Sequence, residues 1–343
     1  MAKEPARDDG VGERLGRGLV LGKFLPPHRG HQFLIDFARH ASRELTVLVC
    51  TLAREPIPGR LRVDWLRQMF PFANVRIVHV DDDDLPQTPE EHPDFWRIWR
   101  DVIRRACPDG VDAFFASEDY GPRTAEAIGG GCRYVEVDRG RTLVPVSGTL
   151  VRSDPMKYWD YLPEPVRPHF VKRVCIFGPE STGKSMLARD LAAHFNTVYA
   201  WEYARPLLDP KGGRCVAADI PNIARGQAAT EDARARQANR VLICDTDVLT
   251  TTIWSDLLFG DTPAWVRTLA EHRTYDLYLL LDVDVPWVDD AQRFFAEPHV
   301  RRQMFDRFRA ALDARGRKYV IVRGDWGERF RAARDAVAAL IGR

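Results

Sequence analysis

Residues 173–195 read RVCIFGPESTGKSMLARDLAAHF. The stretch opens with an apolar run typical of a buried strand, and Leu187, Leu191 and Phe195 then recur at the spacing of one helix face. Between the two segments lies Gly178–Ser185, which matches the eight-residue pattern of a phosphate-binding loop. This order of strand, loop and helix predicts an α/β domain with a parallel sheet and a nucleotide site at the mouth of the helix.

The residues of this loop suit the binding of ATP and Mg²⁺. Gly178 and Gly183 let the backbone curl, so that several amide hydrogens point at one site. Lys184 adds positive charge at the outer phosphates, and the hydroxyl group of Ser185 is placed to bind Mg²⁺. The predicted ATP-binding residues are Gly178, Glu180, Ser181, Thr182, Gly183, Lys184 and Ser185, with Lys184 also catalytic and Ser185 also a metal ligand.

The pattern around this loop predicts one domain over residues 169–343. Short apolar runs alternate with helical periodicity, which is the arrangement of a doubly wound parallel sheet. The predicted strands are Arg173–Phe177, Val198–Trp201, Val241–Cys244, Leu277–Leu281 and Tyr319–Val322, and the predicted helices include Ile220–Asn239 and Glu328–Ile341, with a charged segment between the last two strands.

The same alternation fills the first half of the chain and predicts a second doubly wound parallel sheet, over residues 18–168. Residues 1–17 are polar and mixed in charge, and we predict a flexible tail there. Four prolines between residues 155 and 168 interrupt any regular pattern, so we expect the domain boundary in this region. The predicted strands are Gly18–Phe24, Leu45–Cys50, Val75–Val80, Ala113–Ala116 and Tyr134–Val137, and the predicted helices include Arg62–Phe70 and Phe95–Ala106.

Composition and charge limit the partners and the compartment. The 343 residues include 50 basic and 49 acidic side chains, and a formal net charge of +1 provides no field for binding a nucleic-acid backbone. No apolar run approaches the roughly 20 residues of a membrane span. The six cysteines lack the spacing of a zinc site or a redox pair, and we interpret them as structural. We therefore expect a cytoplasmic protein that acts on small molecules, with no nucleic-acid partner and no membrane span; its oligomeric state stays open, a homo-oligomer included.

Acidic residues after the strand Val241–Cys244 are candidates for the reacting centre of the second domain. Asp245 and Asp247 follow this strand at the carboxyl edge of the sheet, where a ligand of Mg²⁺ or of a substrate hydroxyl is expected. We predict a catalytic role for Asp245 or Asp247, with Asp245 as the metal and substrate ligand. The alternative is that these aspartates cap a helix or shape a turn.

Two further clusters suggest how a substrate is held and how its reaction is promoted. Trp201, Glu202 and Tyr203 follow the preceding strand, and such a cluster is suited to stacking a flat cationic ring and binding ribose hydroxyls, although packing explains the two aromatic residues nearly as well. Arg293 lies where small-molecule kinases keep a mobile lid, and we predict that it neutralises charge on the transferring phosphoryl group. For Arg301 and Arg302, an exposed charged helix explains the sequence about as well as a role in catalysis does.

The first domain has its own phosphate motif, because residues 22–31 read GKFLPPHRGH between the first strand and the first helix. His28 and His31 lie at the mouth of this helix, where donors can hold an ATP phosphate chain while the phosphate of a second nucleotide attacks the α-phosphorus. Late in the domain, the turn Ser147–Arg152 carries hydroxyl groups and ends in an arginine. It is suited either to capping a helix or to binding the β- and γ-phosphates with Arg152.

On these motifs the chain resembles the bifunctional NadR-type family, in which nicotinamide mononucleotide adenylyltransferase is fused to ribosylnicotinamide kinase. The likeness extends from about Gly18 to Arg343. Gly22–His31 looks like the GxFxPxHxGH signature of that family, and Ser147–Arg152 looks like its SxTxxR signature, here with glycine second. The likeness in the second domain rests on Gly178–Ser185, Trp201–Tyr203, Asp245–Asp247 and Trp287–Arg293.

The resemblance implies a Rossmann-like nucleotidyltransferase domain followed by a P-loop kinase domain, both acting in NAD biosynthesis by pyridine nucleotide salvage. The kinase would phosphorylate nicotinamide riboside to nicotinamide mononucleotide (NMN), and the transferase would join NMN to AMP from ATP, forming NAD and pyrophosphate, with Mg²⁺ serving both steps. The implied roles are phosphate binding by Lys23, His28, His31 and Arg152, ATP binding by Gly22, Phe24, Ser147 and Thr149, and substrate binding by Trp96 and Trp99 in the first domain and by Trp201, Glu202, Tyr203, Asp289 and Asp290 in the second.

Several alternatives stay open. Some members of the family carry an N-terminal helix-turn-helix that represses transcription, but only residues 1–17 precede the first predicted strand here, so we expect no repressor activity. The first domain could sense a nucleotide without catalysis, or the whole chain could be a regulatory NTPase. The same two enzymes could also use another nucleoside or the deamidated mononucleotide.

Overall fold

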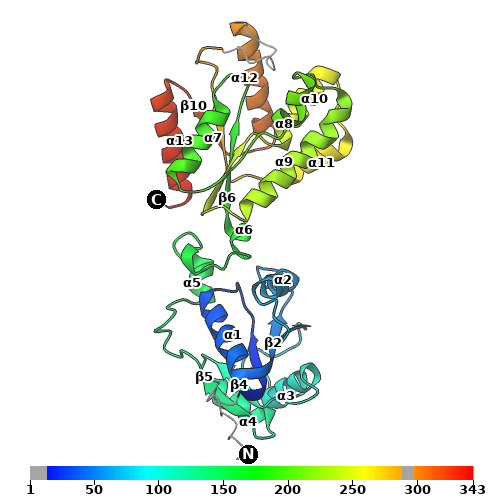
Figure 1. The fold of residues 1–343 in the computed structure, drawn as a ribbon, viewed down its shortest axis with the longest axis vertical. Coiled ribbons are helices and arrows are strands. Elements are labelled where there is room, and N and C mark those ends of the chain that lie inside the picture. Colours follow the sequence, from blue (N-terminus) through cyan, green and yellow to red (C-terminus); the bar gives the residue numbers. More distant parts are fainter. Residues whose placement is uncertain (1–13, 288–296, 343) are drawn as a thin grey trace, which may run out of the picture. The chain divides into compact units, whose positions relative to one another are not determined.

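The computed structural model describes residues 14–287 and 297–342. The chain separates into two compact units, Met1–Val166 and Arg167–Arg343, and each unit contains a parallel five-stranded sheet with helices (Figure 1). The predicted α/β class is therefore confirmed for both halves of the chain.

The central strand of the first sheet is β1 (Leu15–Gly22), and the strand order is β3-β2-β1-β4-β5. Val20 on β1 lies opposite Val47 on one neighbour and Phe115 on the other. Because the strand order reverses at β1, the loop that follows it lies at the switch point where α/β sheets bind ligands. The other strands are β2 (Ser42–Thr51), β3 (Val75–Asp81), β4 (Ala113–Ala116) and β5 (Arg133–Glu136).

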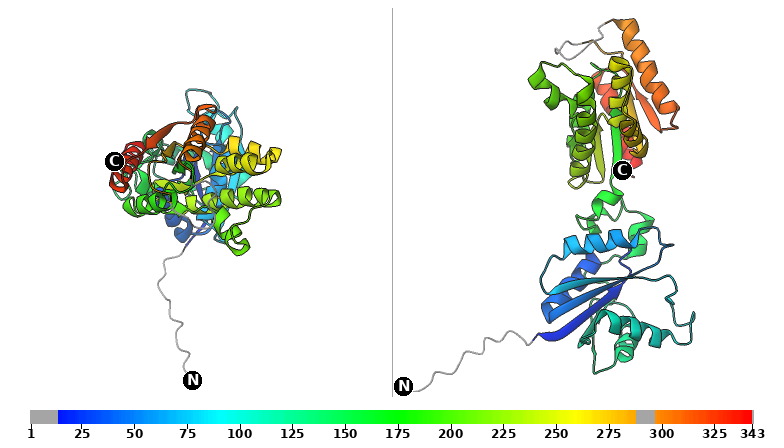
Figure 2. Two further views of the ribbon diagram at one scale, coloured as in Figure 1. Left: turned by 90° about the horizontal axis from the view of Figure 1, so that it is seen from above. Right: turned by 90° about the vertical axis from the view of Figure 1, so that its right-hand side faces the viewer.

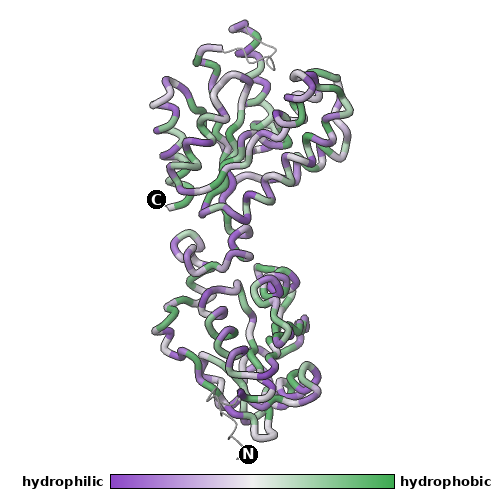
Figure 3. The backbone as a smooth tube through the Cα atoms, viewed as in Figure 1, coloured by the Kyte–Doolittle hydropathy of each residue, from purple (hydrophilic) through white to green (hydrophobic). Residues whose placement is uncertain are grey.

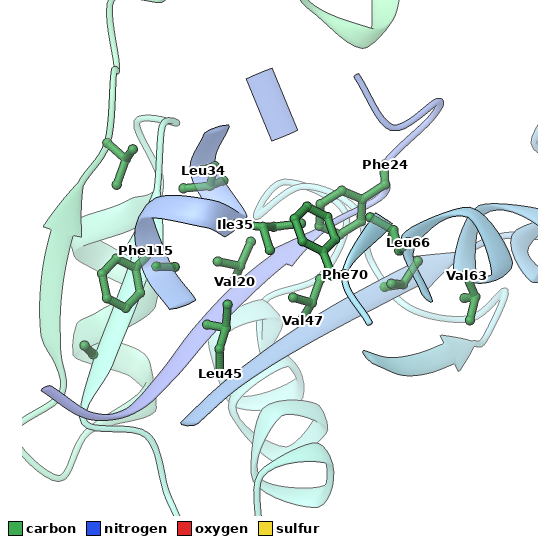
Figure 4. Packing of buried hydrophobic residues seen from close by; sticks show 14 residues of the cluster. Val20, Phe24, Leu34, Ile35, Leu45, Val47, Val63, Leu66, Phe70 and Phe115 are labelled. Carbon is green, nitrogen blue, oxygen red and sulfur yellow. The ribbon is translucent and has the colours of Figure 1, made fainter. Parts of the chain in front are cut away.

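Helices cover both faces of the first sheet. Successive residues of its central strands point to opposite sides, and apolar residues on each side pack against helices. Val20 packs with Leu34 and Ile35 of α1 and with Leu66 of α2 (Figure 4). Leu19 belongs to the core on the other face, which α3 and α4 cover. The helical segments are α1 (Arg29–Ala41), α2 (Gly59–Met69), α3 (Phe95–Ala106), α4 (Gly121–Ile128), α5 (Gly148–Ser153) and η1 (Trp159–Tyr161).

The second sheet is built in the same way around β6 (Lys172–Phe177), with the order β10-β9-β6-β8-β7. Helix α7 packs with α13, and α10 packs with α9 and α11 (Figure 2). The strands are β7 (Tyr199–Ala200), β8 (Val241–Asp245), β9 (Leu277–Leu281) and β10 (Tyr319–Val322); the helical segments are α6 (Arg167–Phe170), α7 (Lys184–His194), α8 (Ala204–Leu208), η2 (Asp209–Lys211), η3 (Ala217–Asp219), α9 (Ile220–Ala235), α10 (Val248–Phe259), α11 (Ala264–His272), α12 (Pro298–Asp313) and α13 (Trp326–Leu340).

All ten predicted strands are present. In both units the backbone alternates between hydrophobic and hydrophilic stretches (Figure 3). The boundaries differ at several places. Strand β1 begins at Leu15, before the predicted start at Gly18, because its first residues pair with β2. Helix α9 ends at Ala235 rather than Asn239, whose backbone N–H donates to Thr197 Oγ1 at 2.9 Å and thereby draws the chain into β8. No helix among the described residues is long and apolar enough to cross a membrane.

Candidate functional sites

The loop Gly178–Ser185 joins β6 to the N-terminus of α7, as predicted. Gly178 has φ +135, and a Cβ atom there would lie 2.9 Å from the carbonyl oxygen of Leu281. Gly183, the N-cap residue of α7, has φ +84. Both positions favour glycine, because other residues disfavour positive φ. At Gly178 the neighbouring backbone also leaves no room for a side chain.

Lys184 lies at the start of α7 and donates from Nζ to the carbonyl oxygen of Pro179 at 2.7 Å. Desolvation lowers the pKa of Lys184, whereas the carboxylates of Glu202 and Asp245 act in the opposite direction. Thr182 Oγ1 donates to the same Pro179 oxygen at 2.9 Å. Two hydrogen bonds to the Pro179 oxygen thus hold the loop in a compact conformation, and one of them comes from the ammonium group of Lys184.

A cavity of about 460 Å³ opens beside this loop. Its volume is in the range of small-molecule sites. All the ATP-binding residues predicted in this loop except Gly178 line the cavity, together with Glu202. Residues from α8, α9 and α10 also line the cavity, including Gln227 and Trp254.

The two candidate aspartates have different surroundings. Asp245 ends β8, is 2% exposed, and accepts a hydrogen bond from Ser185. Its Oδ1 atom is buried without a partner among the described residues, and burial together with Glu202 raises the pKa of Asp245 to about 6. An orphaned buried carboxylate oxygen beside a phosphate-binding loop is an acceptor that a cation or a hydroxyl group can satisfy.

Asp247, in contrast, is the N-cap residue of α10. Its Oδ1 atom accepts from the backbone N–H of Thr250 at 2.8 Å and from the hydroxyl group of Thr250 at 3.0 Å, and its Oδ2 atom accepts from Tyr278 Oη at 2.9 Å. Burial raises the pKa of Asp247 to about 6, against these hydrogen bonds. The capping alternative therefore describes this residue, and its two oxygens are already bound.

The predicted aromatic cluster is only partly at the cavity. Glu202 lines it, but Trp201 and Tyr203 do not. Trp201 is 40% exposed with the guanidinium of Arg234 4.6 Å from its ring centroid, and the ring of Tyr203 fills the space where a Cβ atom on Gly226 would lie. The role of these two rings in substrate binding stays a prediction.

Among the described residues, the aromatic residue that lines the cavity is Trp254 on α10, which no sequence motif predicted. The signal was present in the sequence, because residues 247, 250, 251 and 254 share one helix face. Gln227 was missed as well, and no local pattern marks it. The predicted residues Asp289, Asp290 and Arg293 lie outside the described part of the chain.

In the first unit, His28 and His31 cap the N-terminus of α1. His28 Nδ1 accepts from the backbone N–H of Gly30 at 3.1 Å and from that of His31 at 3.3 Å, and His31 Nδ1 accepts from the backbone N–H of His28 at 3.3 Å. Burial and the Arg141 guanidinium lower the pKa of His28 to about 4, and burial, His28 and Arg141 hold the pKa of His31 well below its usual range.

The protonation state of both rings follows from these contacts. A neutral imidazole whose Nδ1 accepts a hydrogen bond carries its proton on Nε2. At neutral pH His28 and His31 are therefore two uncharged Nε2–H donors, and their rings stack with centroids 3.7 Å apart.

These histidines line a second cavity, of about 510 Å³, at the carboxyl end of β1. Arg141, which no motif predicted, lines it too. The structure brings the predicted transferase residues of both motifs together here, as all of the following line the cavity: Gly22, Lys23, Phe24, His28, His31, Ser147, Thr149 and Arg152.

The turn Ser147–Arg152 is held against the first motif. Ser147 caps α5 and accepts from the backbone N–H of Leu150 at 3.2 Å, so the capping alternative holds for this residue. Arg152 donates to Thr149 Oγ1 at 3.2 Å and to the carbonyl oxygen of Leu25. The second motif thus binds directly to the backbone of the first.

A buried carboxylate supports Lys23. Glu55 lies 3.0 Å from Lys23 Nζ and accepts from Arg62 Nη2 at 2.6 Å, and Arg62 also donates to the carbonyl oxygen of Lys23 at 2.8 Å. Arg62 is fully buried. This arrangement fixes both the backbone and the side chain of Lys23 at the rim of the cavity.

Trp96 and Trp99 lie on α3 and do not line this cavity. Trp99 Nε1 donates to the carbonyl oxygen of Pro86 at 2.9 Å, and its ring packs against the core under α3. Trp96 contacts Phe95, with ring centroids 5.0 Å apart. Their role in substrate binding stays a prediction.

Known proteins resemble this chain over both units. A family model described as an AAA domain matches residues 173–329. The trifunctional NAD biosynthesis/regulator protein NadR of Escherichia coli (strain K12) is 32% identical over 349 residues, which cover 95% of this chain and 83% of that protein. The protein of the same name from Salmonella typhimurium (strain LT2) is 31% identical with the same coverage.

Solved structures show the same fold. A crystal structure of a NadR protein in complex with NR has a TM-score of 0.80 and 23% identity, and covers 96% of this chain and 97% of its own. A second, of a NadR protein in complex with NAD and AMP-PNP, has a TM-score of 0.77 and 23% identity over 96% of this chain and 98% of its own.

Proposed function

Because the chain belongs to the NadR family of NAD biosynthesis proteins, we propose that its two units catalyse successive steps of NAD formation. The second unit, a P-loop kinase domain over residues 169–343, phosphorylates nicotinamide riboside to NMN. The first, a Rossmann-like nucleotidyltransferase domain over residues 18–168, transfers an adenylyl group from ATP to NMN. The observation that carries this proposal is that each unit has a phosphate-binding motif directly after the central strand of its sheet, and each motif opens onto its own cavity.

In the kinase, the loop amides and Lys184 bind the phosphates of ATP, and the carboxylate of Asp245 is the general base. The 5′-hydroxyl oxygen of the riboside attacks the γ-phosphorus, the bond to the bridging oxygen breaks, and ADP leaves. Asp245 accepts the hydroxyl proton, because its buried Oδ1 atom has no hydrogen-bond partner among the described residues. Asp247 supports the site as a helix cap.

The donor set fits one magnesium ion. Ser185 and Asp245 are hydrogen-bonded to each other and offer one hydroxyl and one carboxylate oxygen, and Mg²⁺ usually takes its remaining ligands from phosphates and water. No group of three or more His, Cys, Asp or Glu side chains that could hold a metal ion occurs among residues 14–287 and 297–342. The ion would neutralise charge on the phosphates.

Glu202 and Trp254, which both line the cavity, are the residues that bind the riboside in this proposal. A ribose hydroxyl can donate to the Glu202 carboxylate, and the positively charged nicotinamide ring can stack on the indole of Trp254. The roles of Asp289, Asp290 and Arg293 stay predictions, because these residues lie outside the described part of the chain.

In the transferase, the phosphate of NMN attacks the α-phosphorus of ATP and pyrophosphate leaves. The Nε2–H groups of His28 and His31, with Lys23 and Arg152, donate hydrogen bonds to the phosphates as negative charge moves onto the leaving group. No covalent intermediate with the protein is needed, since positioning and charge stabilisation suffice. The cytoplasmic location is likewise part of the proposal.

The test is an assay of purified protein with Mg²⁺-ATP and nicotinamide riboside that follows NMN and NAD separately. Lys184→Ala should stop riboside phosphorylation and still convert added NMN, whereas His31→Ala should do the reverse. The exposed residues Lys318 and His40 provide matched control substitutions to alanine.

The outcomes separate the alternatives. Accumulation of NMN without NAD in the wild type would leave a kinase with a nucleotide-sensing first unit. Turnover of neither substrate would contradict the proposal and favour a regulatory NTPase.

A further inference from the structure

Two buried arginines from the end of the chain bind consecutive carbonyl groups of the phosphate-binding loop. Arg301 on α12 donates from Nη2 to the Ser181 oxygen at 3.3 Å, and Arg329 on α13 donates from Nη1 to the Thr182 oxygen at 2.8 Å. The partners are 120 and 147 residues apart in sequence. The conformation of the loop therefore depends on elements that no local motif includes.

These contacts fix the direction of two amide groups. In a planar trans peptide the C=O and the following N–H point in opposite directions. A guanidinium on the Ser181 oxygen therefore turns the N–H of Thr182 away from Arg301, and one on the Thr182 oxygen turns the N–H of Gly183 away from Arg329. Residues 181–185 all line the cavity, where these amides are the donors for phosphate.

The backbone at this point also requires support. Ser181 has φ 56, a left-handed conformation that costs a residue with a side chain free energy. Gly183 has φ +84, and a Cβ atom on it would lie 2.4 Å from Trp326 of α13. Three successive loop residues, 181–183, thus each contact α12 or α13.

Arg329 donates hydrogen bonds to several segments of the chain besides the loop. It is 2% exposed and donates to the carbonyl oxygens of Asp282 at 2.7 Å and Gly324 at 3.0 Å, and to the carboxylate of Asp284. Arg301, 7% exposed, donates to the Val285 oxygen at 3.0 Å. Only a guanidinium has enough donors in a planar fork to join these segments, because an ammonium group is a single point.

We propose that Arg301 and Arg329 are positioning residues that hold the phosphate-binding loop ready for ATP. Neither touches substrate; both act through the Ser181 and Thr182 peptide groups. The inference rests on the proposed kinase function, and it names residues whose loss would specifically weaken ATP binding in that unit.

The experiment compares Arg329→Lys and Arg301→Lys with the wild type in the full chain. Arg329→Lys should raise the KM for ATP in riboside phosphorylation about 10- to 100-fold. Arg301→Lys should raise it about 3- to 10-fold, because the contact of Arg301 with the Ser181 oxygen, at 3.3 Å, is longer than the 2.8 Å contact of Arg329 with the Thr182 oxygen. The KM for the riboside and the rate of NMN adenylylation by the first unit should stay within about twofold of the wild type. Arg331→Lys and Arg307→Lys, at exposed positions of the same two helices, serve as controls.

Hydrogen exchange over residues 178–185 provides a readout independent of catalysis. Exchange should become faster in both variants, and ATP should protect the loop less than in the wild type. Wild-type KM values for ATP together with unchanged exchange in both variants would overturn the proposal. Should Arg329→Lys unfold the unit, Arg301→Lys decides. A wild type that protects its loop with ATP but leaves the riboside unphosphorylated would refute the kinase function and leave the positioning role standing.

Discussion

The phenolic hydroxyl of Tyr278 on β9 donates a hydrogen bond at 2.9 Å to Oδ2 of Asp247, the N-cap residue of α10. Asp245, two residues earlier, has no such partner for its buried Oδ1 atom among the described residues. Two aspartates that look equivalent in the sequence therefore have different surroundings, because both oxygens of Asp247 accept hydrogen bonds whereas one buried oxygen of Asp245 does not.

The first prediction contrasts these two residues. Asp245→Asn should lower riboside phosphorylation about 100-fold or more, because the proton acceptor is lost, without lowering the melting temperature. Asp247→Ala should destabilise the unit by about 1–3 kcal/mol, because the α10 cap and the partner of Tyr278 are lost. Kinetics and thermal unfolding of both variants provide the comparison; the opposite pattern would assign the base to Asp247.

The second prediction concerns the nicotinamide ring. Trp254→Ala should raise the KM for nicotinamide riboside about tenfold, because a cavity-lining ring is removed, and leave the KM for ATP unchanged. Trp201→Ala is the matched control, since Trp201 is 40% exposed outside the cavity. Steady-state kinetics measure both values, and an equal effect of the two substitutions would contradict the assignment.

The third prediction follows from the contact between the two motifs of the first unit. A Cβ atom on Gly148 would lie 2.7 Å from the backbone oxygen of Leu25 and 3.3 Å from Arg152 Nη1. Gly148→Ala should therefore displace the turn that carries Arg152 and lower NAD formation from NMN about tenfold or more, with riboside phosphorylation unaffected. Gly140→Ala is the control, because its Cβ would make an ordinary 3.4 Å contact. Retention of the full adenylylation rate would show that the turn is not needed in this position.

The fourth prediction concerns pH. His28 titrates near pH 4 when folded and near pH 6.5 when unfolded, so the unfolded chain binds more protons between these values. Stability of the first unit should thus fall as the pH decreases from 6.5 towards 4, by about 2 kcal/mol at pH 5 from His28, and His31 acts in the same direction.

His28→Asn provides the test, because asparagine keeps a capping acceptor and does not titrate. Urea unfolding at pH 7 and pH 5, followed by hydrogen exchange in α1, should show a smaller pH effect in this variant. His40→Asn, at an exposed position of the same helix, should retain the wild-type pH dependence. An equal loss in all three proteins would exclude the buried histidine as the cause.

Local chemistry in the sequence was sufficient for the class of the fold and for both phosphate motifs. Apolar runs alternate with helical periodicity, and strand–loop–helix motifs require glycine and histidine at fixed spacings, so Gly178–Ser185 and Gly22–His31 are recognisable without coordinates.

Only the tertiary structure decided which side chains face the cavities. Trp201 and Tyr203 do not line the cavity and contact Arg234 and Gly226, so their role in substrate binding stays a prediction, whereas Trp254 does line it. The environments of Asp245 and Asp247 likewise depend on Ser185 and Tyr278, which come from other segments. Burial and hydrogen bonding between distant segments are set by packing, whereas a local sequence pattern specifies only its own backbone; for this reason the roles of Arg301 and Arg329 emerge from the folded chain alone.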